Sequence, residues 1–200
     1  MDVEKIEKEL KKIKDEVLQC QKCPLYKTRT LPVIGEGSHQ AKIIFIGEAP
    51  GASEDKTGYP FCGAAGKVLN ELLESIGIKR EEIYITNILK DRPPDNRNPK
   101  TEEIEACTPY LLKQIEIIKP KVICTLGNFS TAFIFEKYGL KDKIKGISKI
   151  HGNVFYPVRS LLSNGVEVKI VPLYHPAAAT YNPNMKEILK KDFQIFKNLQ

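Results

Sequence analysis

Three polar side chains with different chemistry each stand at the end of an apolar run. They are the carboxylate of Glu48, the carboxamide of Asn87 and the imidazole of His175. The runs are short and rich in Ile and Val, which is typical of buried strands, and they cover residues 43–47, 83–89 and 166–174. In open α/β sheets ligands bind beyond the carboxyl ends of the strands, so we expect the three side chains to meet there.

Cysteines supply a second set of candidate ligands. Cys20 and Cys23 are two residues apart in a C-x2-C pair, and Cys107 and Cys124 follow far downstream. Four thiolates hold either zinc or an iron–sulfur cluster, and spacing alone does not choose between them. Disulfides are not expected, because a reducing compartment keeps thiols free. Cys62 lies in a Gly-rich loop and is interpreted as a non-ligand.

Strands alternate with helices along the chain. Apolar residues three or four apart predict a helix over 3–17, and a similar stripe over 68–76 ends at Gly77. Thr101 is expected to cap a helix that carries Cys107, and further helices are predicted over 128–138 and 184–198. Two more strands are predicted over 122–127 and 152–158, with a turn at 163–165 before the last strand.

This alternation implies crossover connections between parallel strands. The predicted fold class is therefore α/β, a three-layer sandwich with a small, mostly parallel central sheet flanked by helices. The 200 residues, 42% of them hydrophobic, are expected to form a single domain over 1–200.

Composition and charge exclude some locations and permit one class of partner. The chain has no run of 18 apolar residues and no signal-peptide layout, so we expect a cytoplasmic protein without a membrane partner. Its net charge of +6 is compatible with a polyanionic partner. The loop over 90–99 contains three prolines, two arginines and a lysine, and is suited to contacts with phosphates.

Together these motifs resemble the family 4 uracil-DNA glycosylases, the iron–sulfur members of the uracil-DNA glycosylase superfamily found in archaea and thermophilic bacteria. The resemblance covers nearly the whole chain. It rests on Gly47-Glu48-Ala49-Pro50-Gly51, Pro60-Phe61 before Gly63, Thr86-Asn87 running into Arg92-Pro93-Pro94 and Asn96-Arg97-Asn98-Pro99, His175-Pro176-Ala177-Ala178, and the four-cysteine set.

The resemblance implies a DNA repair enzyme that flips uracil out of DNA, hydrolyses its N-glycosidic bond and leaves an abasic site. Asn87 would read the base, because its amide complements uracil N3–H and O4. Phe61 would stack on the flipped ring, and Glu54 would exclude the methyl group of thymine. The implied uracil pocket consists of Gly47, Glu48, Ala49, Glu54, Phe61, Asn87 and His175.

The resemblance also suggests how the bond is broken. His175 would donate a hydrogen bond to uracil O2 as negative charge develops on the departing base, helped by backbone N–H groups around Glu48 and Ala49. Ala49 stands where the best-known branch of the superfamily has an Asp. Glu48 is therefore our hypothesis for the group that positions or deprotonates the attacking water. No lysine occupies a matched pocket position, so a monofunctional glycosylase is expected.

The implied cofactor is a 4Fe-4S cluster with Cys20, Cys23, Cys107 and Cys124 as ligands, which would tie the first helix and the cysteine pair (1–24) to the rest. Asp91 departs from the family, since many members have Cys or another residue there.

The implied partner is uracil-containing DNA, a sliding clamp is a further candidate, and we expect a monomer. Arg92 and Arg97 would contact the DNA. Tyr181 would fill the gap left by the flipped base, because Ala179 lacks the long side chain found in relatives.

Two other function classes are compatible with parts of the sequence. One is an electron-transfer protein, although no Gly-x-Gly-x-x-Gly motif follows a strand to indicate a second cofactor. The other is a zinc-stapled module that binds nucleic acid without catalysis. The colour of the purified protein separates a cluster from zinc, and alkaline cleavage of a treated uracil oligonucleotide separates an enzyme from a binder.

Overall fold

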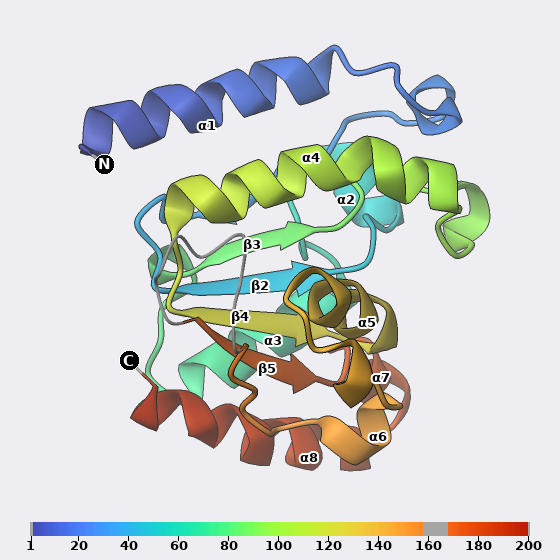
Figure 1. The fold of residues 1–200 in the computed structure, drawn as a ribbon. Coiled ribbons are helices and arrows are strands. Elements are labelled where there is room, and N and C mark those ends of the chain that lie inside the picture. Colours follow the sequence, from blue (N-terminus) through green and yellow to red (C-terminus); the bar gives the residue numbers. More distant parts are fainter. Residues whose placement is uncertain (1, 158–167, 200) are drawn as a thin grey trace.

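A five-stranded sheet forms the middle layer of the computed structural model, which describes residues 2–157 and 168–199 (Figure 1). The strand order is β1-β3-β2-β4-β5. β2 pairs in parallel with both β3 and β4, β4 pairs in parallel with β5, and β1 is antiparallel to β3. The strands are β1 (Glu36–Gly37), β2 (Ile43–Gly47), β3 (Tyr84–Asn87), β4 (Val122–Leu126) and β5 (Lys169–Leu173). The predicted α/β class and the mostly parallel sheet are confirmed.

Helices cover both faces of this sheet. One face packs against α1 (Val3–Leu18), α4 (Thr101–Ile118), α5 (Asn128–Lys137) and α6 (Ile147–Ile150). The other face packs against α3 (Ala64–Glu74) and α8 (Pro183–Phe193). In Figure 1, α1 lies alongside α4 on the same side of the sheet. Two short helices, α2 (Ala52–Thr57) and α7 (Ala178–Tyr181), follow closely after the carboxyl ends of β2 and β5.

Side chains of the central strands alternate between the two cores, as the pleat of a strand requires. Ile44 and Ile123 pack in the core beneath α1 and α4. Phe45 and Cys124, one residue further along, pack in the core beneath α3 and α8. Because both faces are covered, the strands are apolar throughout instead of alternating apolar and polar residues.

The helix at Thr101 begins one residue earlier than predicted. Lys100 is the N-cap residue, and its N–H donates to the Glu103 carboxylate at 2.8 Å. Thr101 is therefore the first helical residue, and its predicted role as the cap is wrong. The Glu103 carboxylate thus satisfies the N–H of the N-cap residue, which is the half of a capping box that the third helical residue supplies.

Two further predictions about the sheet differ from the structure. The predicted strand over 152–158 is reduced, within its described part, to one antiparallel bridge between Phe155 and Ile170. The predicted turn at 163–165 lies outside the described residues. β1 was not predicted, because two residues are too few to show a pattern. The terminal helix predicted over 184–198 is α8 followed by a 3₁₀ segment, Gln194–Asn198.

No helix in the described part of the chain is long and apolar enough to span a lipid bilayer.

The loop between α2 and α3 contains a strained aromatic residue. Phe61 is buried and has a φ of 48°, a left-handed conformation that bulky residues seldom adopt. Strain of this kind persists only where the surroundings impose it. Gly66 contributes, because a Cβ built on it would lie 1.6 Å from the Phe61 carbonyl oxygen. The backbone of α3 thus approaches the loop as closely as glycine permits.

Replacing Gly66 with alanine should therefore disturb the Phe61 loop. We expect Gly66→Ala to lower the free energy of unfolding by about 1 to 3 kcal/mol, the usual cost of overpacking, measured by urea denaturation. Lys67→Ala is the matched control, because Lys67 is the next residue of α3 and is exposed. Equal midpoints for Gly66→Ala and the wild type would contradict this account.

Candidate active site

The carboxyl edge of the sheet brings together the three side chains that end apolar runs. Glu48 follows β2 directly, Asn87 is the last residue of β3, and His175 lies two residues beyond β5. Gly47 and Asn87 are register partners in the parallel β2–β3 pair. The ladder continues past the strands, since Leu89 N donates to Glu48 O at 3.0 Å. All four parallel arrows in Figure 1 point to this edge.

Close contacts join the ends of these strands to the strained loop. The rings of Phe61 and His175 stack, with centroids 5.5 Å apart and an interplanar angle of 29°. A Cβ at Gly47 would lie 2.3 Å from Asn87 Oδ1 and 2.9 Å from Phe61 Cζ. Gly47 therefore lets the aromatic ring and the amide approach the end of β2. The structure brings Gly47, Phe61, Asn87 and His175 into one contiguous group.

A surface cleft of about 590 Å³ opens beside His175, which is the one member of this group that lines it. Glu48 and His175 both line it, together with Tyr174, Asn98 and Asn128. Asn98 belongs to the motif Asn96-Arg97-Asn98-Pro99, but the sequence alone assigns it no role. No local pattern marks Tyr174 and Asn128 as site residues, because they reach the cleft from a strand end and a helix start. The cleft is large enough for a small planar ligand in contact with Glu48 and His175.

His175 is held in one hydrogen-bonding arrangement. Its Nδ1 accepts a bond from the backbone N–H of Ala177 at 3.2 Å, so the neutral ring carries its proton on Nε2. Burial lowers the pKa of His175 to about 4, and the charge of Glu54 opposes this effect only in part. At neutral pH the side chain is thus an uncharged hydrogen-bond donor through Nε2.

Glu48 and the residue after it differ from the rest of the group in their exposure. Both Glu48 and Ala49 are half-buried at the turn after β2. Burial raises the pKa of the Glu48 carboxyl. No hydrogen bond or ion pair engages this carboxylate among residues 2–157 and 168–199. A carboxylate in such surroundings is a stronger base than one in water, and is suited to accept a proton.

Glu54 braces the loop that carries Phe61. Its two carboxylate oxygens accept bonds from three backbone N–H groups, those of Gly51 at 3.1 Å, Cys62 at 3.1 Å and Gly63 at 3.2 Å. Three charge-assisted bonds fix the carboxylate. Glu54 therefore links the start of α2 to the start of α3 and holds the loop in place beside His175.

The two arginines of the proline-rich loop have different partners. Both residues are partly exposed, and Arg92 Nε donates to Asn96 Oδ1 at 2.9 Å. Arg97 forms a two-bond ion pair with the buried Glu103, at 2.9 and 2.5 Å. Arg97 thus fastens the loop to the first turn of α4. Tyr181, at the end of α7, is 89% exposed.

Three of the predicted cysteine ligands meet, and one does not. Cys20 follows α1, Cys23 precedes a short 3₁₀ helix at Pro24–Lys27, and Cys107 lies on α4. All three line one small cavity, which Asp91 also lines. Burial raises the pKa of the Cys23 thiol, and raises that of Cys107 to about 11. In the absence of a metal these thiols hold their protons.

The prediction that Cys124 is the fourth ligand is wrong. Cys124 is the central residue of β4, paired in register with Phe45 and Val171, and all three belong to the core beneath α3 and α8. The other three cysteines lie on the opposite face of the sheet, with α1 and α4. The sheet itself therefore separates Cys124 from them. Across the described residues no group of three or more His, Cys, Asp or Glu side chains is arranged around a single metal ion.

Comparison with known proteins identifies the family. The family model for the uracil DNA glycosylase superfamily matches residues 34–197. A type-4 uracil-DNA glycosylase from Sulfurisphaera tokodaii is 48% identical over 95% of this chain and 84% of its own length.

The chain belongs to the type-4 uracil-DNA glycosylases.

Other members of the type-4 family are similar over comparable lengths. The type-4 uracil-DNA glycosylase of Archaeoglobus fulgidus is 48% identical over 90% of this chain and 87% of its own. That of Thermotoga maritima is 41% identical over 93% and 92%. The sequence-based recognition of the family is therefore confirmed.

One buried lysine of this type-4 chain lies directly behind Asn87. Lys90 is 1% exposed, and its Nζ donates to Thr86 Oγ1 at 2.6 Å, Asn87 O at 2.9 Å and Gln114 Oε1 at 2.8 Å. Burial lowers its pKa to about 7. Lys90 thus holds the backbone carbonyl of Asn87 in place through a hydrogen bond. Lys90 is the lysine of the 90–99 loop that the sequence suits to phosphate contacts, and its burial makes that prediction wrong for this residue. A sequence does not reveal that a lysine is enclosed.

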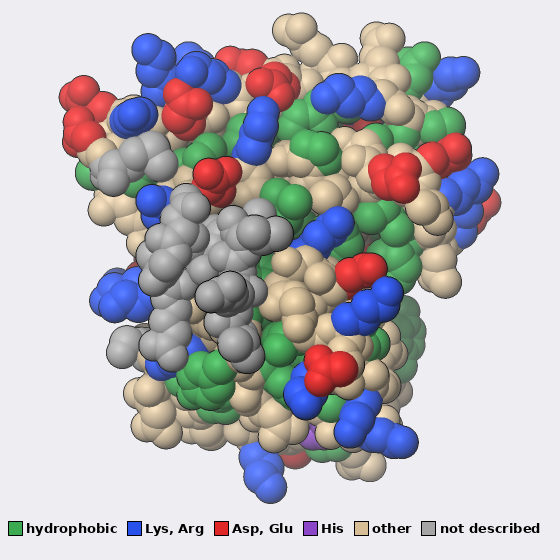
Figure 2. All heavy atoms as spheres, in the orientation of Figure 1, with side chains coloured by type: hydrophobic (Ala, Val, Ile, Leu, Met, Phe, Trp, Pro, Cys, Tyr) green, Lys and Arg blue, Asp and Glu red, His purple; other side chains and the backbone are tan. Residues whose placement is uncertain are grey.

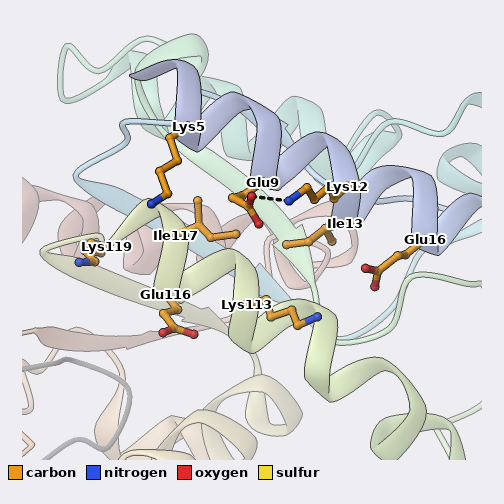
Figure 3. Close-up of a pocket in the computed structure, with 9 residues that line it drawn as sticks. All are labelled: Lys5, Glu9, Lys12, Ile13, Glu16, Lys113, Glu116, Ile117 and Lys119. Carbon is orange, nitrogen blue, oxygen red and sulfur yellow. Dashed lines mark hydrogen bonds and ion pairs between the residues drawn. The ribbon is translucent and has the colours of Figure 1, made fainter. Parts of the chain in front are cut away.

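Another hollow, of about 370 Å³, lies between α1 and α4 and has a lining of mixed charge. Figure 3 shows Lys5 and Lys113 alternating with Glu9 and Glu116 in it. Figure 2 likewise shows acidic and basic side chains interspersed on the face that carries α1 and α4. The net positive charge is therefore not gathered on this face, outside the residues drawn in grey.

The low pKa of His175 makes a prediction about acid stability. Between about pH 6.5 and pH 4 the unfolded chain binds a proton on this residue and the folded chain does not, so acidification favours unfolding. From pH 7 to pH 5 the wild type should lose about 2 kcal/mol more unfolding free energy than His175→Gln, measured by urea denaturation. Equal losses in the two proteins would show that His175 titrates normally.

Proposed function

We propose that this chain removes uracil from DNA, by hydrolysing the N-glycosidic bond of a nucleotide flipped out of the helix and leaving an abasic site for repair. The observation that supports this most strongly is the meeting of Glu48, Asn87 and His175 with Phe61 at one edge of the sheet. An acid, an amide, an imidazole and an aromatic ring are the groups that recognition and release of a pyrimidine require.

Base recognition is assigned to Asn87 and Phe61. Asn87 is 2% exposed, and its amide makes no hydrogen bond to another described residue, so its donor and acceptor remain free to pair with O4 and N3–H of a uracil that reaches it. Cytosine presents the opposite pattern. Lys90 and the β2–β3 ladder hold the Asn87 backbone and so restrict where the amide can lie. Stacking of the flipped ring on Phe61 would add about 1 to 3 kcal/mol.

Bond cleavage is assigned to His175 and Glu48. As the bond from the sugar to N1 breaks, its electron pair stays on uracil, and Nε2–H of His175 donates to the O2 that gains negative charge. Glu48 accepts a proton from the attacking water, whose oxygen bonds to the sugar carbon. Backbone N–H groups near Glu48 and Ala49 assist at the departing base. Uracil leaves as its N1 anion and takes a proton from solvent, and Glu48 returns the proton that it accepted. The products are free uracil and an intact abasic site, so the enzyme is monofunctional.

The remaining site roles follow from position. Glu54, fixed by three N–H groups beside His175, would crowd a methyl group at C5 and so exclude thymine. Arg92 would contact a phosphate near the cleft. Arg97, paired with Glu103, would act on DNA mainly by shaping the loop around Asn98, which lines the cleft.

An iron–sulfur cluster is proposed at the cavity lined by Cys20, Cys23 and Cys107. Three thiol ligands from two distant segments suit such a cluster, because soft thiolates are its preferred donors. When bound, the cluster would crosslink the end of α1 to α4 and supply no acid–base chemistry. The sequence 1–24 would then be joined to the domain by covalent bonds as well as by packing.

Replacing the Glu48 carboxylate with an amide tests whether Glu48 is the general base. We expect Glu48→Gln to lower the single-turnover rate on a uracil-containing oligonucleotide by about 100-fold or more, since general base catalysis commonly contributes this much. Strand breaks are counted after alkali treatment. Glu136→Gln is the control, because Glu136 is exposed on α5. If Glu48→Gln kept the full wild-type rate, Glu48 would not be the general base.

Truncating Tyr181 tests its role in flipping. We expect Tyr181→Ala to slow uracil release from duplex DNA about 10-fold and to leave release from single strands nearly unchanged, because only the duplex leaves a gap to fill. Tyr156→Ala, at another exposed tyrosine, is the control. Equal slowing on both substrates would assign Tyr181 to binding instead of flipping.

A further inference from the structure

The cavity proposed for the cluster has a fourth donor that is not a cysteine. Cys20, Cys23 and Cys107 line it, and the carboxylate of Asp91 lines it with them. Asp91 is 4% exposed, so its oxygens face protein and not solvent. Within the described residues the remaining cysteines do not approach this cavity, since Cys124 lies across the sheet and Cys62 is exposed in another loop.

Arg29 holds the Asp91 carboxylate in a defined orientation. Its Nη1 donates to Asp91 Oδ1 at 3.0 Å and Oδ2 at 2.9 Å, and its Nη2 donates to Leu18 O at 2.9 Å. The guanidinium thereby ties the carboxylate to the end of α1, two residues before Cys20. Each carboxylate oxygen has two lone pairs, and the arginine occupies only one on each. Asp91 can therefore bind a metal without losing Arg29.

We propose that Asp91 is the fourth ligand, so that this chain holds a four-iron cluster through three thiolates and one carboxylate. This rests on the proposed cluster, and not on the proposed glycosylase chemistry. Four irons and four sulfides take up more space than one metal ion. The four donors of such a cluster therefore line a cavity and need not converge on a single position. Arg29 is a positioning residue, because it acts on the cluster through Asp91.

The mixed ligand set makes one iron different from the other three. Thiolates are soft donors that suit iron–sulfur clusters, whereas a carboxylate is a hard donor and binds such iron more weakly. The iron held by Asp91 should therefore be the first to leave. When ferricyanide takes one electron from the oxidised four-iron cluster, one Fe²⁺ departs and three ferric irons remain on the three thiolates.

The test compares the wild type with Asp91→Cys and Cys124→Ser after anaerobic reconstitution with iron and sulfide. We expect the wild type and Cys124→Ser to hold equal iron, and both to give the EPR signal of a three-iron cluster after ferricyanide. Asp91→Cys should suppress that signal at least 5-fold, because a fourth thiolate retains the last iron. Mössbauer spectra of the ⁵⁷Fe-loaded wild type should show one distinct iron among four, which needs no variant.

Three results would overturn the proposal, and they are separable. Loss of iron from Cys124→Ser would restore Cys124 as a ligand. Equal three-iron signals in the wild type and Asp91→Cys, with four equivalent irons in the Mössbauer spectrum, would remove Asp91 from the cluster. A wild type that takes up no iron and sulfide but still releases uracil from DNA would dismiss the cluster and leave the glycosylase standing.

Discussion

The parallel pairing of β2 with β3 on one side and β4 on the other is the constraint on which the site depends. This pairing sends the carboxyl ends of β2, β3, β4 and β5 to one edge, where side chains far apart in the chain become neighbours. The ladder is buried on both faces, so a shift of one residue would exchange the two cores and is strongly disfavoured. Glu48 and Asn87 are thereby placed by backbone hydrogen bonds, not by their own side-chain contacts.

Close packing at that edge fixes the Phe61 ring against His175, which the pairing of the strands alone does not do. Gly47 leaves room for the Phe61 ring and the Asn87 amide, and Phe61 in turn stacks on His175. The loop that presents Phe61 is strained, and it is held by the Glu54 carboxylate and by the close approach of Gly66. The proposed stacking of a planar base on Phe61 would require such rigidity, because a mobile ring would lose the contact.

The positions of the three strand-end residues could be predicted from the sequence, and the position of Cys124 could not. Glu48, Asn87 and His175 need only local information, since an apolar run ending at a polar residue already places that residue at an edge. The position of Cys124 depends on which face of β4 it occupies, which is set by pairing with Phe45 and Val171. The burial of Lys90 could not be predicted for the same reason, because it depends on residues distant in the sequence such as Gln114.

The central claim is that Asn87 and His175 bind one uracil together. The most direct measurement is a nitrogen-15 NMR titration of the protein with free uracil, followed through the Asn87 side-chain amide and the His175 ring nitrogens, with cytosine as the control base. We expect uracil to shift both sets of signals with one dissociation constant and cytosine to shift neither. Uracil that moves only one of them, or cytosine that moves both equally, would contradict it.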